Sequence, residues 1–124
     1  MTLVLIGMAG AAGAVARLVM GDWVARWRKG SVFPWGTFAV NILGSFLLGL
    51  VTGLFLGREV ISPAAKAVLG TGFLGALTTF STWQMETYRL CRRGNRLEAS
   101  ANLLFSAVSG LISAWLGLSL GWSL

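Results

Sequence analysis

The sequence predicts an all-α membrane protein of four transmembrane helices. Hydrophobic residues make up 56% of the 124 residues and charged residues only 11%, whereas soluble domains average roughly a quarter charged residues. Four apolar segments are each long enough to cross a bilayer core, which takes about 20 residues per helix. The short connectors between them carry most of the charge. We therefore expect residues 1–124 to form one transmembrane domain.

The four predicted helices cover residues 2–24, 36–56, 63–90 and 99–124. No basic region precedes the first apolar run and no clear small-residue cleavage site follows it, so we expect a retained helix and not a signal peptide. Small residues recur at helical spacing in the first two helices, which favours close helix packing in lipid. These residues are Gly7, Gly10, Gly13, Ala14, Gly44, Gly49 and Gly53.

The composition argues against several classes of chemistry. The chain has no histidine and a single cysteine, Cys91, which argues against disulfide frameworks, zinc sites and Cys/His catalysis. No nucleophile–base pair appears elsewhere, so we do not expect an enzyme. The net charge of +6 would suggest nucleic acid in a soluble protein. Here the basic residues flank apolar runs, so we expect contact with membrane lipid and not with nucleic acid.

The basic residues are distributed unevenly between the two sides of the predicted bundle. With four spans, the first and third connectors share one side and hold Arg26, Arg28, Lys29, Arg92, Arg93 and Arg96, with Arg89 at the edge. The opposite side holds Arg58 and Lys66. Short loops rich in Lys and Arg favour the cytoplasm. We therefore expect both termini to face outward and one orientation to dominate.

The stretch GFLGALTTFSTW, residues 72–83, places two glycines, three threonines and a serine within the third apolar segment. Gly75, Thr78 and their neighbours weaken a helix locally, and irregular backbone at membrane depth needs protein or a water cavity around it. One interpretation is a broken helix whose free carbonyls hold a cation and whose amino ends face an anion. The alternative is an ordinary helix whose hydroxyls bond to the preceding turn.

Other polar residues lie inside the predicted spans. Asn41 needs hydrogen-bond partners if buried and would serve as a link between helices or as a pore ligand. Arg17 would either extend to the interface or close a polar vestibule, and Glu86 would be either buried or interfacial. In the fourth helix a set of polar residues would face a pore or another helix: Asn102, Ser106, Ser109 and Ser113.

Three blocks of the sequence resemble the Fluc/CrcB family of fluoride channels: GAAGAVARL (10–18), GTFAVNILGSFLLG (36–49) and GFLGALTTFSTW (72–83). The resemblance covers nearly the whole chain, and TTFST after an internal VN is its most specific part. It implies a channel that passively exports fluoride from the cytoplasm across the cell inner membrane. It also implies an antiparallel, dual-topology-type dimer of four-helix subunits, each with a broken third helix.

The resemblance also implies roles for particular residues. A structural sodium ion would lie at the break, held by the backbone carbonyls of Gly75 and Thr78. Fluoride is strongly hydrated, so a narrow pore must replace its water with donors and with the positive edges of aromatic rings. The implied pore residues are Asn41, Phe80, Ser81, Thr82, Trp83 and Ser106, and Arg17 and Glu86 match supporting positions.

The chain departs from the family pattern in its pore. Trp83 stands where the family has its second pore phenylalanine, and its larger ring and N–H donor would narrow the pore or change how fluoride is held. The polar positions of the family's fourth helix match this chain at Ser106, but the next two fall on Gly110 and Ala114. Ser109 and Ser113 are each one residue away from those positions, about a quarter turn around the helix.

These departures and the charge bias lead to a hypothesis about assembly. Some family members insert both ways and form homodimers, whereas others are pairs of related chains with fixed, opposite orientations. We expect this chain to be one half of an antiparallel heterodimer. One rival is a proton-coupled exporter of cationic drugs, which needs a buried carboxylate in the first helix. The first helix has no carboxylate before Asp22, which lies near its end. Another rival is a non-conducting assembly subunit.

Overall fold

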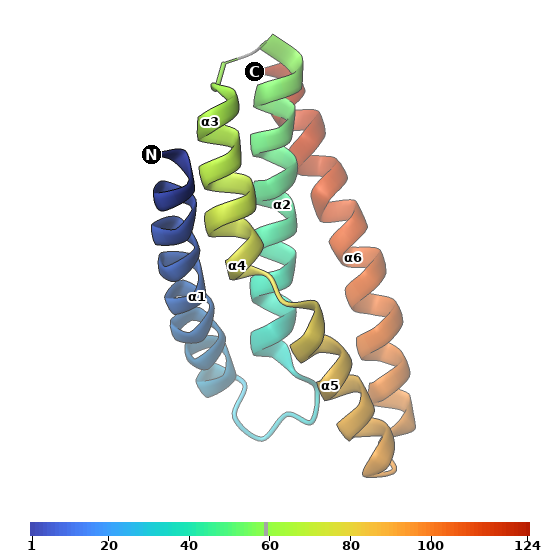
Figure 1. Ribbon diagram of the computed structural model, residues 1–124. Coiled ribbons are helices and arrows are strands. Elements are labelled where there is room, and N and C mark those ends of the chain that lie inside the picture. Colours follow the sequence, from blue (N-terminus) through green and yellow to red (C-terminus); the bar gives the residue numbers. More distant parts are fainter. Residues whose placement is uncertain (59) are drawn as a thin grey trace.

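The computed structural model describes residues 1–58 and 60–124, which form helices joined by short connectors (Figure 1). Within these described residues, three helices are long and apolar enough to cross a membrane. They are α1 (Thr2–Trp27), α2 (Trp35–Arg58) and α6 (Arg96–Ser123). A segmented pass lies between α2 and α6 in the chain and consists of α3 (Pro63–Lys66), the π-helix η1 (Ala67–Leu74), α4 (Gly75–Leu77) and α5 (Phe80–Arg92). The predicted all-helical class with a broken third helix is confirmed.

The most extensive helix pair is α2 with α6. Glycines on both helices let the two backbones approach. A Cβ atom on Gly49 would meet the Ala114 carbonyl, and one on Gly117 would meet the Phe46 carbonyl and lie 2.9 Å from the Leu50 nitrogen. These glycines therefore fix the distance between the two helices and their rotation about their axes.

Helix α1 packs against the first half of the segmented pass, η1 and α4. Gly13 of α1 is buried against the Phe73 carbonyl, and Gly72 of η1 lies against Ile6. Beyond the break, α5 leaves α1 and packs on α6. Figure 1 shows this change of neighbour as a sideways step of the chain between α4 and α5.

Both termini lie at one end of the bundle, and the α1–α2 and α5–α6 connectors lie at the other (Figure 1). Both of these connectors turn at glycines with positive φ, Gly30 at 91° and Gly94 at 84°, a conformation that disfavours other residues. The basic residues of the two connectors therefore share one end, as the sequence predicts. The remaining connector contains Glu59, which lies outside the described residues.

The helices run past the predicted limits where charged residues continue the helical pattern. Helix α1 ends at Trp27 instead of residue 24, and α6 begins at Arg96 instead of residue 99. A prediction based on apolar runs stops at the first charges, although the backbone hydrogen bonding does not. The π-helical turn of η1 was not predicted, because its residues are as apolar as those of an ordinary helix.

Candidate functional site

The break in the third pass lies at Thr78 and Thr79. Both have extended backbones, with φ −80° and ψ 157° at Thr78 and φ −147° and ψ 118° at Thr79. The Asn41 side chain on α2 replaces the lost helical bonds. Its Oδ1 accepts from the Thr79 N–H at 2.7 Å, and its Nδ2 donates to the Thr79 carbonyl at 2.9 Å. Asn41 therefore links two helices and stabilises the break.

Thr79 also begins the helix that follows. Its hydroxyl accepts a hydrogen bond from the Thr82 N–H at 3.2 Å and donates to the Thr82 hydroxyl at 3.0 Å. The Ser81 hydroxyl lies 3.5 Å from the same oxygen. A threonine in this position satisfies one of the free N–H groups at a helix start. The TTFST sequence thus encodes both the end of α4 and the start of α5.

The diverted hydrogen bonds leave two carbonyls without their usual helical donors. The Gly75 carbonyl would ordinarily accept from the Thr79 N–H, which donates to Asn41. The Thr78 carbonyl would ordinarily accept from the Thr82 N–H, which donates to the Thr79 hydroxyl. Carbonyls freed at a helix break are the oxygen ligands that sodium ions take in membrane proteins. The two carbonyl oxygens at the break are therefore ligands of a kind that suits a sodium ion.

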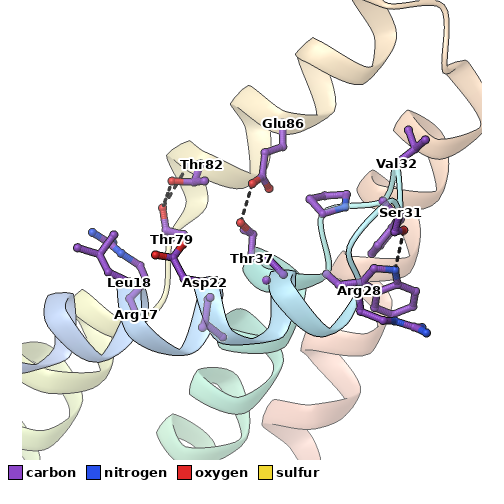
Figure 2. A pocket seen from close by; sticks show the side chains of 17 residues that line it. Arg17, Leu18, Asp22, Arg28, Ser31, Val32, Thr37, Thr79, Thr82 and Glu86 are labelled. Atoms are coloured by element: carbon purple, nitrogen blue, oxygen red, sulfur yellow. Dashed lines mark hydrogen bonds between the residues drawn. The ribbon is translucent and has the colours of Figure 1, made fainter.

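A cavity of about 400 Å³ opens beside the break toward the basic end of the bundle. We call it the charged cavity, because Arg17, Asp22 and Glu86 line it. Figure 2 shows these side chains with Thr79 and Thr82 on the same cavity. The Thr37 hydroxyl donates to Glu86 Oε1 at 2.8 Å. Glu86 Oε2 is buried and has no hydrogen-bond partner in the described part of the chain.

A second cavity, of about 470 Å³, lies on the other side of Thr79. We call it the aromatic cavity, because Phe80 and Trp83 line it, with their rings 5.5 Å apart at 76°. Its polar wall comes from α2 and the break, and α6 supplies the opposite wall over about two turns. The lining includes Asn41, Ser45, Thr78, Thr79, Ser106, Gly110 and Ala114.

Thr79 and the Asn41–Thr79 hydrogen bonds lie between the two cavities, because Thr79 lines both. An anion that passed from the charged cavity to the aromatic cavity would pass hydroxyls, an amide and ring edges. These groups are weak donors that can contact an anion without holding it tightly. The arrangement of these groups suits the passage of a small anion.

Trp83 uses its N–H within the protein. The indole Nε1 donates to the Asn102 carbonyl of α6 at 2.9 Å. The ring therefore borders the aromatic cavity with its N–H already bonded to α6. Of the two effects expected from the sequence, a narrower pore and an added donor, the geometry favours the first.

The structure brings most of the predicted residues to one of the two cavities. Arg17, Thr82 and Glu86 line the charged cavity. Asn41, Thr78, Phe80, Trp83 and Ser106 line the aromatic cavity. Ser81 and Gly75 line neither of these two cavities; both are exposed.

Sequence reasoning missed three lining residues: Thr37, Ser45 and Thr79. In the sequence Thr79 is only one of the helix-weakening neighbours of Thr78, and the roles that the resemblance implies fall on Thr78 and Phe80 instead. Thr37 and Ser45 lie four residues on either side of Asn41 and therefore share its helix face. This spacing was the available signal. Ser113 proved to be a packing residue, since its hydroxyl donates to the Ile42 carbonyl at 2.9 Å.

The fold defines a small multi-pass membrane protein whose third pass is broken between two cavities. Residues 4–118 match the family described as CrcB-like protein, Camphor Resistance (CrcB). The chain belongs to the CrcB family. The resemblance seen in the three sequence blocks is therefore confirmed.

Individual relatives match along nearly their whole length. A protein of Symbiobacterium thermophilum named fluoride-specific ion channel FluC 1 is 58% identical over 98% of both chains. A protein of Geotalea uraniireducens named fluoride-specific ion channel FluC is 45% identical over 94% of both chains. Another from Magnetococcus marinus is 43% identical over 98% of both chains.

Proposed function

We propose that this chain forms a fluoride-selective channel that lets fluoride leave the cytoplasm passively and so lowers its concentration there. The observation that carries the proposal is the full-length similarity to proteins named fluoride-specific ion channels, at identities up to 58%. The aromatic cavity supports it, because hydroxyls, an amide and aromatic edges surround one space beside a helix break. The relatives' names describe channels and not enzymes.

We propose that the working unit is an antiparallel dimer in the cell inner membrane, with both termini outside. Phe80 is 70% exposed although it borders the aromatic cavity. A pore lined by this ring needs another surface to close it, and a second subunit is the simplest source. The excess of basic residues at one end supports a single orientation. The partner would then be a related chain inserted the opposite way.

We propose that a sodium ion at the break is part of this assembly. The Gly75 and Thr78 carbonyls would contribute to holding it, since both have lost their usual helical donors to other acceptors. A fixed cation would supply positive charge near the anion path. The chain's own residues shape the break; the ion would add electrostatic support when bound.

Fluoride efflux from liposomes tests the channel proposal. The purified chain is reconstituted with valinomycin and a potassium gradient to set the voltage, and chloride serves as the control anion. Fast, fluoride-selective efflux from the chain alone would support a channel and contradict the heterodimer. Efflux only after addition of a relative with the opposite charge bias would support both the channel and the heterodimer. Failure of both preparations, with protein shown to be folded, would contradict the channel proposal and favour a non-conducting subunit.

A further inference from the structure

Asn102 is a buried amide that the ion pathway described above does not use. Its side chain is 1% exposed, and it lies in an apolar helix where unpaired polar atoms are costly. It does not line the aromatic cavity, although Ser106, one turn later, does. The Ser106 hydroxyl donates to Asn102 Oδ1 at 3.2 Å. The hydrogen bonds of Asn102 therefore need an explanation other than direct contact with the permeant ion.

A closed ring of hydrogen bonds joins Asn102 to Trp83. The Trp83 indole Nε1 donates to the backbone carbonyl of Asn102 at 2.9 Å. The Asn102 amide Nδ2 donates to the Thr87 hydroxyl at 2.8 Å. That hydroxyl in turn donates to the Trp83 carbonyl at 2.9 Å. Three residues on two helices thus hold one another at both the backbone and the ring of Trp83.

This ring of hydrogen bonds has two consequences for the aromatic cavity. First, the indole is fixed at one edge by α6 and packs edge-on against Phe80. It therefore has little freedom to turn into the cavity of about 470 Å³ beside it. Second, its only polar atom is bonded to the Asn102 carbonyl. An indole has a single N–H and no acceptor, so Trp83 presents carbon-bound hydrogens to the cavity, as a phenylalanine would.

We infer that Asn102 is a positioning residue for the pore, which acts with Thr87 to hold the Trp83 indole against α6 and to keep its N–H away from the permeant anion. The larger ring is thereby accommodated at a position that a smaller ring could fill without such support. For its effect on ion passage the inference rests on the proposed fluoride channel. The hydrogen-bonded ring itself does not depend on that function.

Indole NMR tests the ring independently of conduction. The full chain is labelled with ¹⁵N at its tryptophan indoles, and the Trp83 signal is the one of six that disappears in Trp83→Phe. We expect this N–H to exchange slowly and its position to stay unchanged when fluoride is added, as with chloride. In Asn102→Leu and in Thr87→Val, exchange should accelerate about tenfold, the scale of one net hydrogen bond. A fluoride-specific shift of the wild-type signal would overturn the inference.

Two further variants separate positioning from general destabilisation. Thr87→Ser keeps the hydroxyl and should retain slow exchange. Thr52→Val is the matched control, because its hydroxyl also bonds four residues back, to Leu48 at 2.8 Å, but lies outside the ring. It should leave the Trp83 signal unchanged. Equal acceleration in Thr52→Val and Thr87→Val, or unchanged exchange in both Asn102→Leu and Thr87→Val, would overturn the inference.

Fluoride flux then tests the consequence, in whichever assembly conducts. Thr87→Val should lower flux about tenfold in the wild-type background and have no effect in the Trp83→Phe background, because no indole is left to position. A merely structural role would lower flux equally in both backgrounds and would overturn the inference. If no preparation conducts, the channel proposal fails, and the indole measurements still decide whether Asn102 positions Trp83.

Discussion

The Asn41 side chain and the Thr79 backbone bond to each other twice, with Nδ2 donating to the carbonyl at 2.9 Å and Oδ1 accepting from the N–H at 2.7 Å. The two residues are 38 positions apart in the chain. This pair of bonds holds the break in the third pass in one defined conformation. It also holds Thr79 in place between the two cavities.

Replacing Asn41 with leucine should strongly destabilise the protein. The change leaves the Thr79 N–H and carbonyl unpaired, and an unsatisfied buried polar group costs about 1–3 kcal/mol. We expect the free energy of unfolding to fall by about 3 kcal/mol, measured by SDS-induced unfolding in mixed micelles and followed by circular dichroism.

Asn95→Leu is the matched control for that experiment. Asn95 precedes α6 and makes no side-chain capping hydrogen bond, so the same substitution removes no comparable pair. Its unfolding free energy should stay close to the wild-type value. Equal losses in the two variants would mean that the Asn41–Thr79 bonds do not stabilise the break.

The position of the break illustrates what the sequence could and could not predict. Apolar length predicts the passes. The glycines and threonines of 72–83 allow either an irregular backbone or an ordinary helix, and it is the family resemblance that implies the break. The choice of Thr78 and Thr79 as the extended residues depends on Asn41, a distant partner of Thr79 that no local pattern identifies. Likewise, Thr79 is buried and lines both cavities, whereas Ser81 is exposed and lines neither. No local pattern in the sequence separates these two hydroxyls.

Replacing Gly117 with alanine should push α2 and α6 apart. The added methyl would meet the Phe46 carbonyl and lie 2.9 Å from the Leu50 nitrogen, and backbone atoms cannot move aside as a flexible side chain can. Overpacking of this kind costs about 1–3 kcal/mol. SDS-induced unfolding should report a loss in that range.

Gly7→Ala provides the comparison, because nothing lies within 4 Å of a Cβ atom there. Alanine is the better helix former by about 1 kcal/mol, so this variant should be as stable as the wild type or more so. A similar loss in both variants would show that the α2–α6 contact is not the cause.

Replacing Thr79 with valine should loosen the start of α5. The change keeps the side-chain shape but removes the hydroxyl that accepts from the Thr82 N–H at 3.2 Å. Losing a threonine cap costs about 1 kcal/mol, which corresponds to about fivefold faster amide exchange. Hydrogen exchange at the first turn of α5 measures this. Thr79→Ser retains the hydroxyl and should exchange at the wild-type rate; if it exchanges as fast as the valine variant, capping is not the cause.

Cys91 can report how the chain is inserted, because it is exposed at the basic end of α5. If the excess of basic residues holds this end in the cytoplasm, a membrane-impermeant maleimide should leave intact cells unlabelled and should label Cys91 in inside-out vesicles. In the Cys91→Ser background, Ser123→Cys at the opposite end of the bundle should give the reverse pattern.

The same experiment bears on the partner. A chain that inserts one way only cannot form an antiparallel dimer with itself, so single-sided labelling requires an oppositely inserted relative. Substantial labelling of Cys91 from both sides would mean dual insertion. It would contradict the heterodimer proposal and make the antiparallel homodimer the working unit.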